Sequence, residues 1–249
     1  MLGSNIEGEQ KKLDEQQIAY FDSEWAVDAQ VESFLNLMND FMPEYPKIIL
    51  DVGGGKGYFA AKINAATKCS VRVLDSDMKS IDTVNERENP VTGVVGDALN
   101  PQIVGDESVI CLNLILHHLI GNHETATRQL QQKGLSVWKD SCSYIFVNEI
   151  MYESYLGNFS SRLIYEITKN KFLSMIGKMI SIFIPSLRAN TFGVGVRFRS
   201  HEDWVSLFTE SGFDITSKIS GEKEPVSFFL RLLLIKEIRR DSFLLSKGG

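Results

Sequence analysis

The chain lacks the features of several common protein classes. Its 249 residues contain three cysteines, Cys69, Cys111 and Cys142, an odd number with no Cys-x-x-Cys pair. A disulfide scaffold and a structural zinc site are therefore disfavoured. A chain of this length builds a core without such staples, so we expect free thiols in a reducing compartment and no metal centre.

Excess positive charge and long apolar runs are also missing. The formal net charge is −6, and the densest basic cluster is only Lys236, Arg239 and Arg240, so we expect no nucleic-acid partner. The first residues are polar, unlike a secretory signal. The longest apolar segment, residues 172–184, has 13 residues and contains Lys178, whereas a membrane span needs about 20 residues. The sequence predicts a cytoplasmic protein without a membrane span.

What is present is a regular alternation of short apolar strands and helices. Short strand-and-helix repeats of this kind are typical of βαβ units, and they predict an α/β fold with a parallel sheet covered by helices on both faces. A helical region over residues 9–42 precedes strands at 47–52, 70–74, 91–95, 109–114 and 144–147, with helices at 60–66, 80–88 and 123–133.

The second half of the chain departs from this alternation. Residues 152–199 are too long for a plain loop and have their own helical periodicity, so we interpret them as an inserted helical cap. The pattern resumes where Ser200 and Asp203 fit a helix-capping box. Residues 213–219 and 227–238 then predict two strands that pair antiparallel at the edge of the sheet.

A glycine-rich loop, Asp51-Val-Gly-Gly-Gly-Lys-Gly57, joins the first strand to the next helix. Gly55, Gly57 and Ala60 fit the GxGxxA pattern of dinucleotide sites, although two extra glycines then follow the strand. Asp51 with Gly53, Gly55 and Gly57 fits the acidic-GxGxG pattern of S-adenosylmethionine (SAM) sites. SAM has an ammonium group that Asp51 can neutralise, and it has no pyrophosphate for the helix N-terminus. The loop therefore favours SAM.

Further motifs stand at the ends of the following strands. Asp75 ends the second strand, Asp97 follows the third, and His117-His118 follows the fourth. Together with the glycine loop, residues 51–149 resemble the class I SAM-dependent methyltransferases, particularly the small-molecule O-methyltransferases, which often read DVGGGxG. Ligands of open α/β sheets bind at this edge, where the strands end.

The resemblance implies a Rossmann-like, doubly wound sheet of seven strands, mostly parallel, with a reversed edge strand. It divides the chain into an N-terminal helical segment, residues 1–46, and a SAM-binding domain, residues 47–249, into which the cap at about 152–199 is inserted. By the same resemblance Asp75 holds the ribose hydroxyls, with Asp77 as a nearby alternative, and Asp97 contacts the adenine amino group. The implied cofactor-binding residues are Asp51, Gly53, Gly55, Gly57, Asp75, Asp97 and Asn113.

The candidate catalytic residues are His117, His118 and Glu149. His117 aligns with the general base of the small-molecule O-methyltransferases, which lies in a Leu-His-Asp pattern, but His118 replaces that Asp here. A base is needed when the methyl acceptor is a hydroxyl that must lose its proton. Glu149, after the fifth strand, is expected to orient a histidine or to bind a polar acceptor. His123 and His201 stand at predicted helix starts, where capping explains them better than catalysis.

Aromatic residues outside the motifs are candidates for the acceptor pocket. Tyr20, Phe21 and Trp25 lie in the N-terminal helical region, and Tyr152 begins the insertion. Aromatics at helical spacing are nonetheless usually core residues. The apolar stretch 172–184 is expected to cover an apolar substrate or to contact a second subunit, which leaves a homodimer open.

The predicted function is methyl transfer from SAM to a small-molecule acceptor, with His117 deprotonating a hydroxyl, in small-molecule biosynthesis. A C- or N-methyltransferase on the same fold stays open, and in it His117 would only orient the site. An NAD-dependent oxidoreductase would use the GxGxxA register, but the chain has no Tyr-x-x-x-Lys pair in the right region. A non-catalytic SAM-fold protein is a further alternative, because fold does not dictate chemistry.

Overall fold

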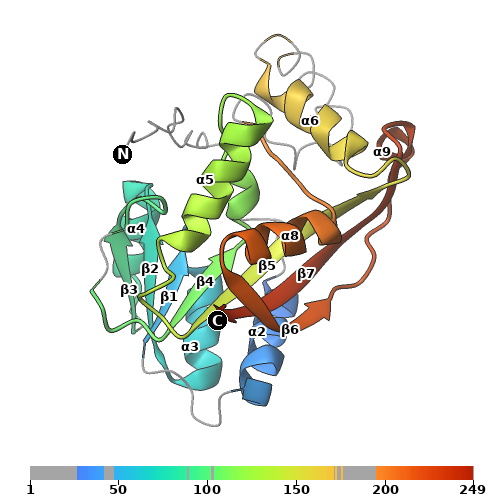
Figure 1. The fold of residues 1–249 in the computed structure, drawn as a ribbon. Coiled ribbons are helices and arrows are strands. Elements are labelled where there is room, and N and C mark those ends of the chain that lie inside the picture. The colour runs from blue at the N-terminus through green and yellow to red at the C-terminus, as the bar shows by residue number, and fades with distance from the viewer. Residues whose placement is uncertain are drawn as a thin grey trace, which may run out of the picture.

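A twisted seven-stranded sheet forms the centre of the protein, in the order β3-β2-β1-β4-β5-β7-β6 (Figure 1). The computed structural model describes residues 27–41, 48–88, 90–101, 104–170, 172, 175 and 195–248. Neighbouring strands from β3 to β5 are parallel, and β7 is antiparallel to both β5 and β6. The predicted sheet is confirmed, with the reversed strand one place inside the edge. The strands are β1 (Ile48–Val52), β2 (Ser70–Asp75), β3 (Val91–Val95), β4 (Val109–Asn113), β5 (Tyr144–Ser154), β6 (Phe213–Ser220) and β7 (Ile235–Lys247).

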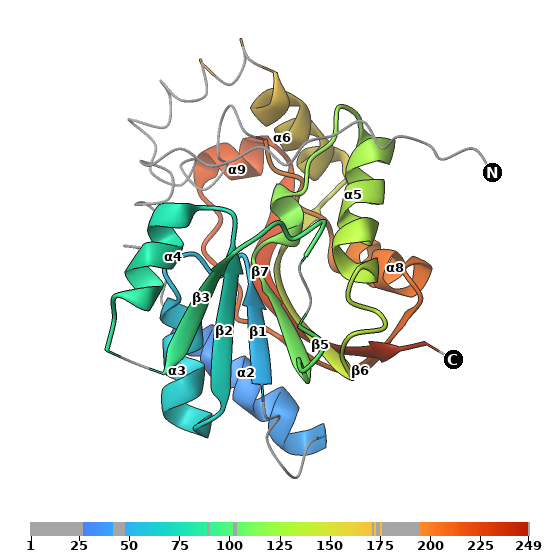
Figure 2. The same cartoon turned by 90° about the vertical axis from the view of Figure 1, so that its left-hand side faces the viewer.

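Helices cover both faces of the sheet, as Figure 2 shows. One face packs against α2 (Asp28–Phe41), α3 (Tyr58–Thr67) and α4 (Met78–Asn85), and the other against α5 (Glu124–Ser136) and α8 (His201–Glu210). The alternation of side chains along each strand separates the two cores, since Ile49 belongs to the first and Leu50 to the second. Both faces of the parallel strands are therefore apolar, as the short uninterrupted runs predicted.

A third apolar cluster lies beyond the main sheet. The last residues of β5 pair with the first residues of β7 in a long antiparallel arm. At its end Figure 1 shows α6 (Phe159–Lys169) and α9 (Phe228–Leu232). Ile164 of α6, Leu230 of α9 and Tyr152 of β5 are buried in this cluster. The insertion thus packs against the arm of the sheet.

Several predicted boundaries are wrong. The fifth strand runs to Ser154 instead of ending at residue 147, because β7 pairs along its whole length. The strand predicted over 227–238 begins as the helix α9, where the Ser227 side chain accepts the backbone N–H of Leu230, and becomes β7 only at Ile235. Of the helical region predicted over 9–42, the structure describes α2, and residues 1–26 lie outside the described residues.

Candidate functional site

The glycine loop turns sharply between β1 and α3. Gly53, Gly55 and Gly57 all have a positive φ, of 71°, 52° and 72°, which residues with a Cβ rarely adopt. A Cβ on Gly53 would lie 2.2 Å from Cδ1 of Ile115, so the loop needs glycine there for space as well. A Cβ on Gly55 would meet no atom within 4 Å. The loop therefore presents bare backbone to open space, which suits a ligand that approaches closely.

Asp51 is a buried carboxylate without a partner. It is 1% exposed, and neither side-chain oxygen accepts a hydrogen bond. Its neighbours on the adjacent strands are the apolar Val73 and Cys111. Burial, with the negative charge of Asp75 in addition, raises the pKa of Asp51 to about 7. An unpaired buried carboxylate is costly, and a bound cation would compensate for that cost.

Asp75 at the end of β2 is held by the backbone. Its Oδ2 accepts the N–H of Gly55 (2.9 Å) and its Oδ1 accepts the N–H of Asp77 (2.8 Å). Burial raises the pKa of Asp75, and these two hydrogen bonds oppose the rise. Each oxygen keeps a lone pair, so the fixed carboxylate can still accept from two vicinal hydroxyls. Asp77 instead caps α4, where its Oδ2 accepts the N–H of Ser80 (2.9 Å).

A pocket opens beside Asp75 at the carboxyl ends of β1, β2 and β3. Asp97, between two of its lining residues, is exposed, and its Oδ1 accepts the N–H of Leu99 (2.8 Å). The sequence did not single out Ala98 or Ile115, because apolar residues there look like ordinary core. The lining residues are Gly53, Leu74, Asp75, Ser76, Gly96, Ala98 and Ile115.

Buried amides continue the polar edge towards β5. Asn113 ends β4 and is in register with Asn148 of β5, and the Oδ1 of each is buried without a hydrogen-bond partner. Asn148 donates from Nδ2 to the Ser242 hydroxyl (2.7 Å). Because Cys111 pairs with Asp51 and lies two residues before Asn113, the amides share the face of Asp51.

One further buried amide escaped the sequence reasoning. Gln30 of α2 is buried with both side-chain polar atoms unpaired, and α2 packs against this same face of the sheet. No local pattern distinguishes such a residue from an ordinary polar position on a helix. Among the described residues, this face of the sheet therefore has more hydrogen-bonding capacity than they use themselves.

His117 and Glu149 form a buried pair on the other side of the strand ends. His117 lies in the short helix η1 (Leu116–His118) and is 2% exposed, and Glu149 of β5 is 0% exposed. Nδ1 of His117 lies 2.7 Å from Oε2 of Glu149, while Oε1 accepts the N–H groups of Leu116 (2.7 Å) and His117 (3.3 Å). Glu149 therefore positions both the imidazole and the backbone of η1.

The rings around His117 are packed closely. The centroids of His118 and Phe198 lie 4.1 and 4.9 Å from that of His117. Burial, with the neighbouring His117 in addition, lowers the pKa of His118 well below its usual range, so His118 stays neutral at neutral pH. Tyr152 stacks on Phe198 (4.4 Å) and is buried in the third cluster, and burial raises the pKa of its phenol. It does not line the pocket.

The remaining candidate residues have structural surroundings or lie elsewhere. His123 caps α5, with Nδ1 accepting the N–H of Ala126 (3.2 Å). His201 begins α8, and its Nδ1 lies 2.7 Å from Oδ2 of Asp241. Tyr20, Phe21 and Trp25 lie outside the described residues. Within the described part of the chain no group of three His, Cys, Asp or Glu residues could hold a metal ion, and the cysteines are free.

Comparison with known proteins identifies the fold. No protein-family model and no curated protein matches the sequence. A SAM-dependent methyltransferase of Leishmania major superposes with a TM-score of 0.59 at 12% identity, over 93% of this chain and 82% of that one. A geranyl diphosphate methyltransferase in complex with SAM gives 0.53 at 12%, over 94% and 91% of the two chains.

A third structure matches only in part of its length. Human N-acetylserotonin methyltransferase in complex with SAM gives a TM-score of 0.53 at 14% identity, and the match covers 94% of this chain but 56% of the human one. At these identities the likeness concerns the fold alone. The chain has the Rossmann-like fold of the SAM-dependent methyltransferases.

Proposed function

We propose that the protein is a methyltransferase that uses SAM. The observation that carries this proposal is the unpaired, buried Asp51 beside an open glycine loop. The ammonium group of SAM would supply the missing cation. A dinucleotide would instead bring a pyrophosphate to a loop that begins at Asp51, where like charges repel. The reversed strand β7 also departs from the strand order 3-2-1-4-5-6 of dinucleotide folds.

The described residues fit the parts of SAM. Asp51 would pair with the ammonium, Asp75 with the ribose hydroxyls, and the backbone of Gly53, Gly55 and Gly57 would line the close approach. Asp97 follows β3 and Asn113 ends β4 at the same edge, and we propose that Asp97 contacts the adenine amino group. When bound, SAM supplies an electrophilic methyl group on a sulfonium centre. The residues around it then need mainly to align an acceptor and to exclude water.

We propose a small-molecule hydroxyl as the acceptor, with His117 as its general base. We assign the Nδ1–H tautomer to His117, because a carboxylate oxygen of Glu149 lies 2.7 Å from Nδ1 and can accept this hydrogen bond. The lone pair of the neutral imidazole is then on Nε2. That nitrogen would take the hydroxyl proton, and the Glu149 carboxylate would stabilise the resulting imidazolium. Tyr20, Phe21, Trp25 and the insertion at 152–199 are proposed to enclose the acceptor.

A second candidate is C- or N-methylation, in which His117 has a structural role. Two features favour it. His117 is almost fully buried, and the same carboxylate that accepts its Nδ1 also holds the backbone of η1. A pair of this kind fixes a loop whether or not it moves a proton.

Calorimetric titration with SAM, S-adenosylhomocysteine and NADH tests the cofactor. We expect micromolar binding of both sulfur nucleosides and no binding of NADH. Asp75→Asn should weaken SAM binding at least about tenfold, because the amide loses both charge and one acceptor. Asp82→Asn, at an exposed position of α4, is the matched control. Tight NADH binding without a response to SAM would contradict the methyltransferase proposal.

The role of His117 is tested with Glu149→Gln and His117→Gln on phenolic and carboxylic acceptors. Loss of a general base lowers the rate by about 10²–10⁴-fold and should leave SAM affinity unchanged. It should also change the shape of the pH–rate profile, because the group that takes the hydroxyl proton is gone. If melting temperature and SAM affinity fall together while the pH profile keeps its shape, His117 is structural and the acceptor is not a hydroxyl that it deprotonates.

A further inference from the structure

The end of the molecule formed by α6 and α9 exposes large apolar side chains. Six of the thirteen exposed large hydrophobic residues among those described lie there. We call this surface the α6–α9 face. It comprises Tyr155 and Leu156 from the turn before α6, Phe159 from the start of α6, and Phe228, Phe229 and Leu232 from α9, each 47–69% exposed.

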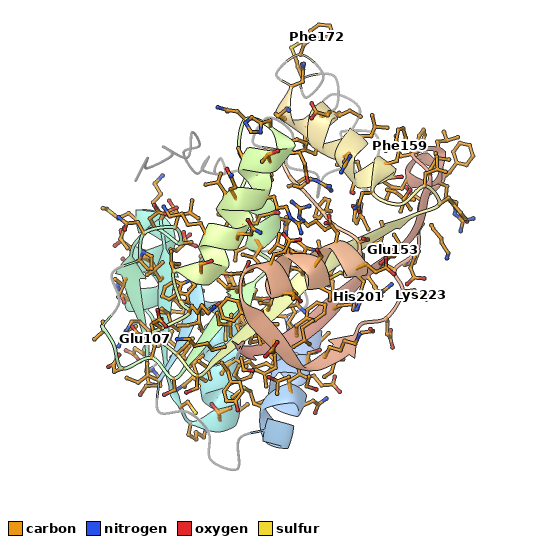
Figure 3. The ribbon with its side chains drawn as sticks, in the orientation of Figure 1. Glu107, Glu153, Phe159, Phe172, His201 and Lys223 are labelled. Atoms are coloured by element: carbon orange, nitrogen blue, oxygen red, sulfur yellow. The ribbon has the colours of Figure 1, made fainter. Side chains whose placement is uncertain are left out.

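The two halves of the α6–α9 face are joined by hydrogen bonds. The N–H of Tyr155 donates to the carbonyl of Leu234 (3.1 Å), and the hydroxyl of Ser160 donates to the carbonyl of Leu233. Figure 1 shows α6 and α9 together at the far end of the β5–β7 arm, and Figure 3 labels Phe159 where they meet. The apolar residues therefore form one surface, and surfaces of this kind usually mark an interaction site.

The charge of this end is opposite to that of the whole protein. Residues 155–175 contain three basic residues and one acidic one, and residues 226–236 contain two basic residues and no acidic one, in a chain of net charge −6. Arg162, Arg231 and Lys236 are exposed and form no ion pair with any other residue that the structure describes. The exposed apolar side chains thus stand among uncompensated positive charges.

We propose that the α6–α9 face docks onto a lipid bilayer surface that carries anionic headgroups. Aromatic and leucine side chains partition into the interface while arginine and lysine meet the headgroup charge. A second copy of the chain fits less well. A twofold contact would bring two copies of the same positively charged surface together, and the described part of the face holds no surplus acidic residues to offset that charge. No helix of the described residues is long and apolar enough to cross the membrane.

Vesicle co-sedimentation of the full chain tests the proposal. We expect binding to vesicles of equal parts phosphatidylglycerol and phosphatidylcholine, weaker binding to phosphatidylcholine alone, and loss of the difference at high salt. The double variant Phe228→Ser/Phe229→Ser should bind the mixed vesicles at least about tenfold more weakly. The double variant Arg231→Glu/Lys236→Glu should bind anionic vesicles more weakly by about the same factor, and its binding to phosphatidylcholine vesicles should not change.

Matched controls separate docking from folding. Met78→Ser and Val104→Ser change apolar residues that are 63% and 65% exposed elsewhere, and Lys133→Glu reverses an exposed charge on α5. All three should bind as the wild type does. Absence of wild-type binding, or undiminished binding by the double phenylalanine variant, overturns the proposal. If the wild type is a dimer that does not bind vesicles, and the double phenylalanine variant is a monomer, the face contacts a second copy of the chain instead. SAM titration of the same samples keeps the cofactor question separate.

Discussion

Charged residues lie on both sides of the sheet, and they differ in whether the chain supplies an opposite charge for them. Arg197, 0% exposed, donates from Nε to Glu124 (2.7 Å). Arg199 donates from Nη1 to both Glu124 (3.0 Å) and Asp203 (2.7 Å). At the glycine loop, by contrast, the equally buried Asp51 accepts nothing.

The pKa values of the carboxyl groups follow this difference. Burial alone would raise the pKa values of Glu124 and Asp203, but the arginines beside them overcome it and lower both. Burial raises the pKa of Asp51 to about 7, and the negative charge of Asp75 adds to the rise. The charges of the first group are thus paired within the chain, although Nη2 of both arginines is buried without a hydrogen-bond partner. The charge of Asp51 has no such partner among the described residues, and under the proposed function the ammonium group of SAM would supply it.

The largest expected effect on stability comes from removing one arginine of the ion-pair network. Arg197→Met should lower the free energy of unfolding by about 1.5–3 kcal/mol, because the half-buried Glu124 loses one of its two arginine partners, and the melting temperature by about 3–10 °C. SAM affinity of the folded protein should change little. Thermal unfolding beside Arg162→Met, an exposed arginine, measures this. A loss as small as that of the control would mean that the network is not structural.

The next largest effect comes from neutralising Asp51. Asp51→Asn should weaken SAM binding at least about 30-fold, because the ammonium loses its only buried counter-charge. The ligand-free variant should be no less stable than the wild type at pH 8. The pKa of Asp51 is about 7 in the folded wild type, against 3.8 in the unfolded chain. The free energy of unfolding of the wild type therefore falls as the pH rises between these values, whereas that of Asp51→Asn does not. Unchanged SAM affinity would refute the ammonium assignment.

Proton release on binding gives a smaller and more specific signal. Asp51 must be ionised to pair with a cation, and its pKa is about 7, so the affinity for SAM should rise about 25-fold between about pH 5.5 and about pH 7.5, with release of a proton. Calorimetry in two buffers of different ionisation enthalpy measures that proton. Asp51→Asn should release none, and proton release that persists in the variant would point to another group, with Asp75 the first to examine.

The same contrast explains what the sequence could predict. Asp51, Gly53 and Asp75 sit at strand ends inside short motifs, so local pattern and the geometry of parallel strands were enough to bring them together. The carboxylate that pairs with Arg197 belongs to Glu124, 73 residues earlier, and no local pattern links the two. Contacts across such distances depend on how the insertion packs.

Two further differences have the same kind of cause. Glu149 accepts from η1 only because β5 and β4 are neighbours in the sheet, which the motif order suggested without giving the contact. The run that begins at Ser227 is apolar in both helical and strand periodicity, and periodicity alone does not separate the two for short runs. The serine cap of α9 was the available signal, and it was missed.

The smallest expected effect separates two neighbouring carboxylates at the cofactor site. Asp77→Ala removes the cap of α4 and should cost about 1 kcal/mol, or about 2–4 °C in melting temperature. SAM affinity should stay within about threefold, because the backbone N–H of residue 77, which holds Asp75, is unchanged by the substitution. Thermal unfolding and SAM titration of Asp77→Ala beside Asp75→Asn measure both quantities. If Asp77→Ala weakens SAM as much as Asp75→Asn does, the ribose contact belongs to Asp77 and the cap is only part of its role.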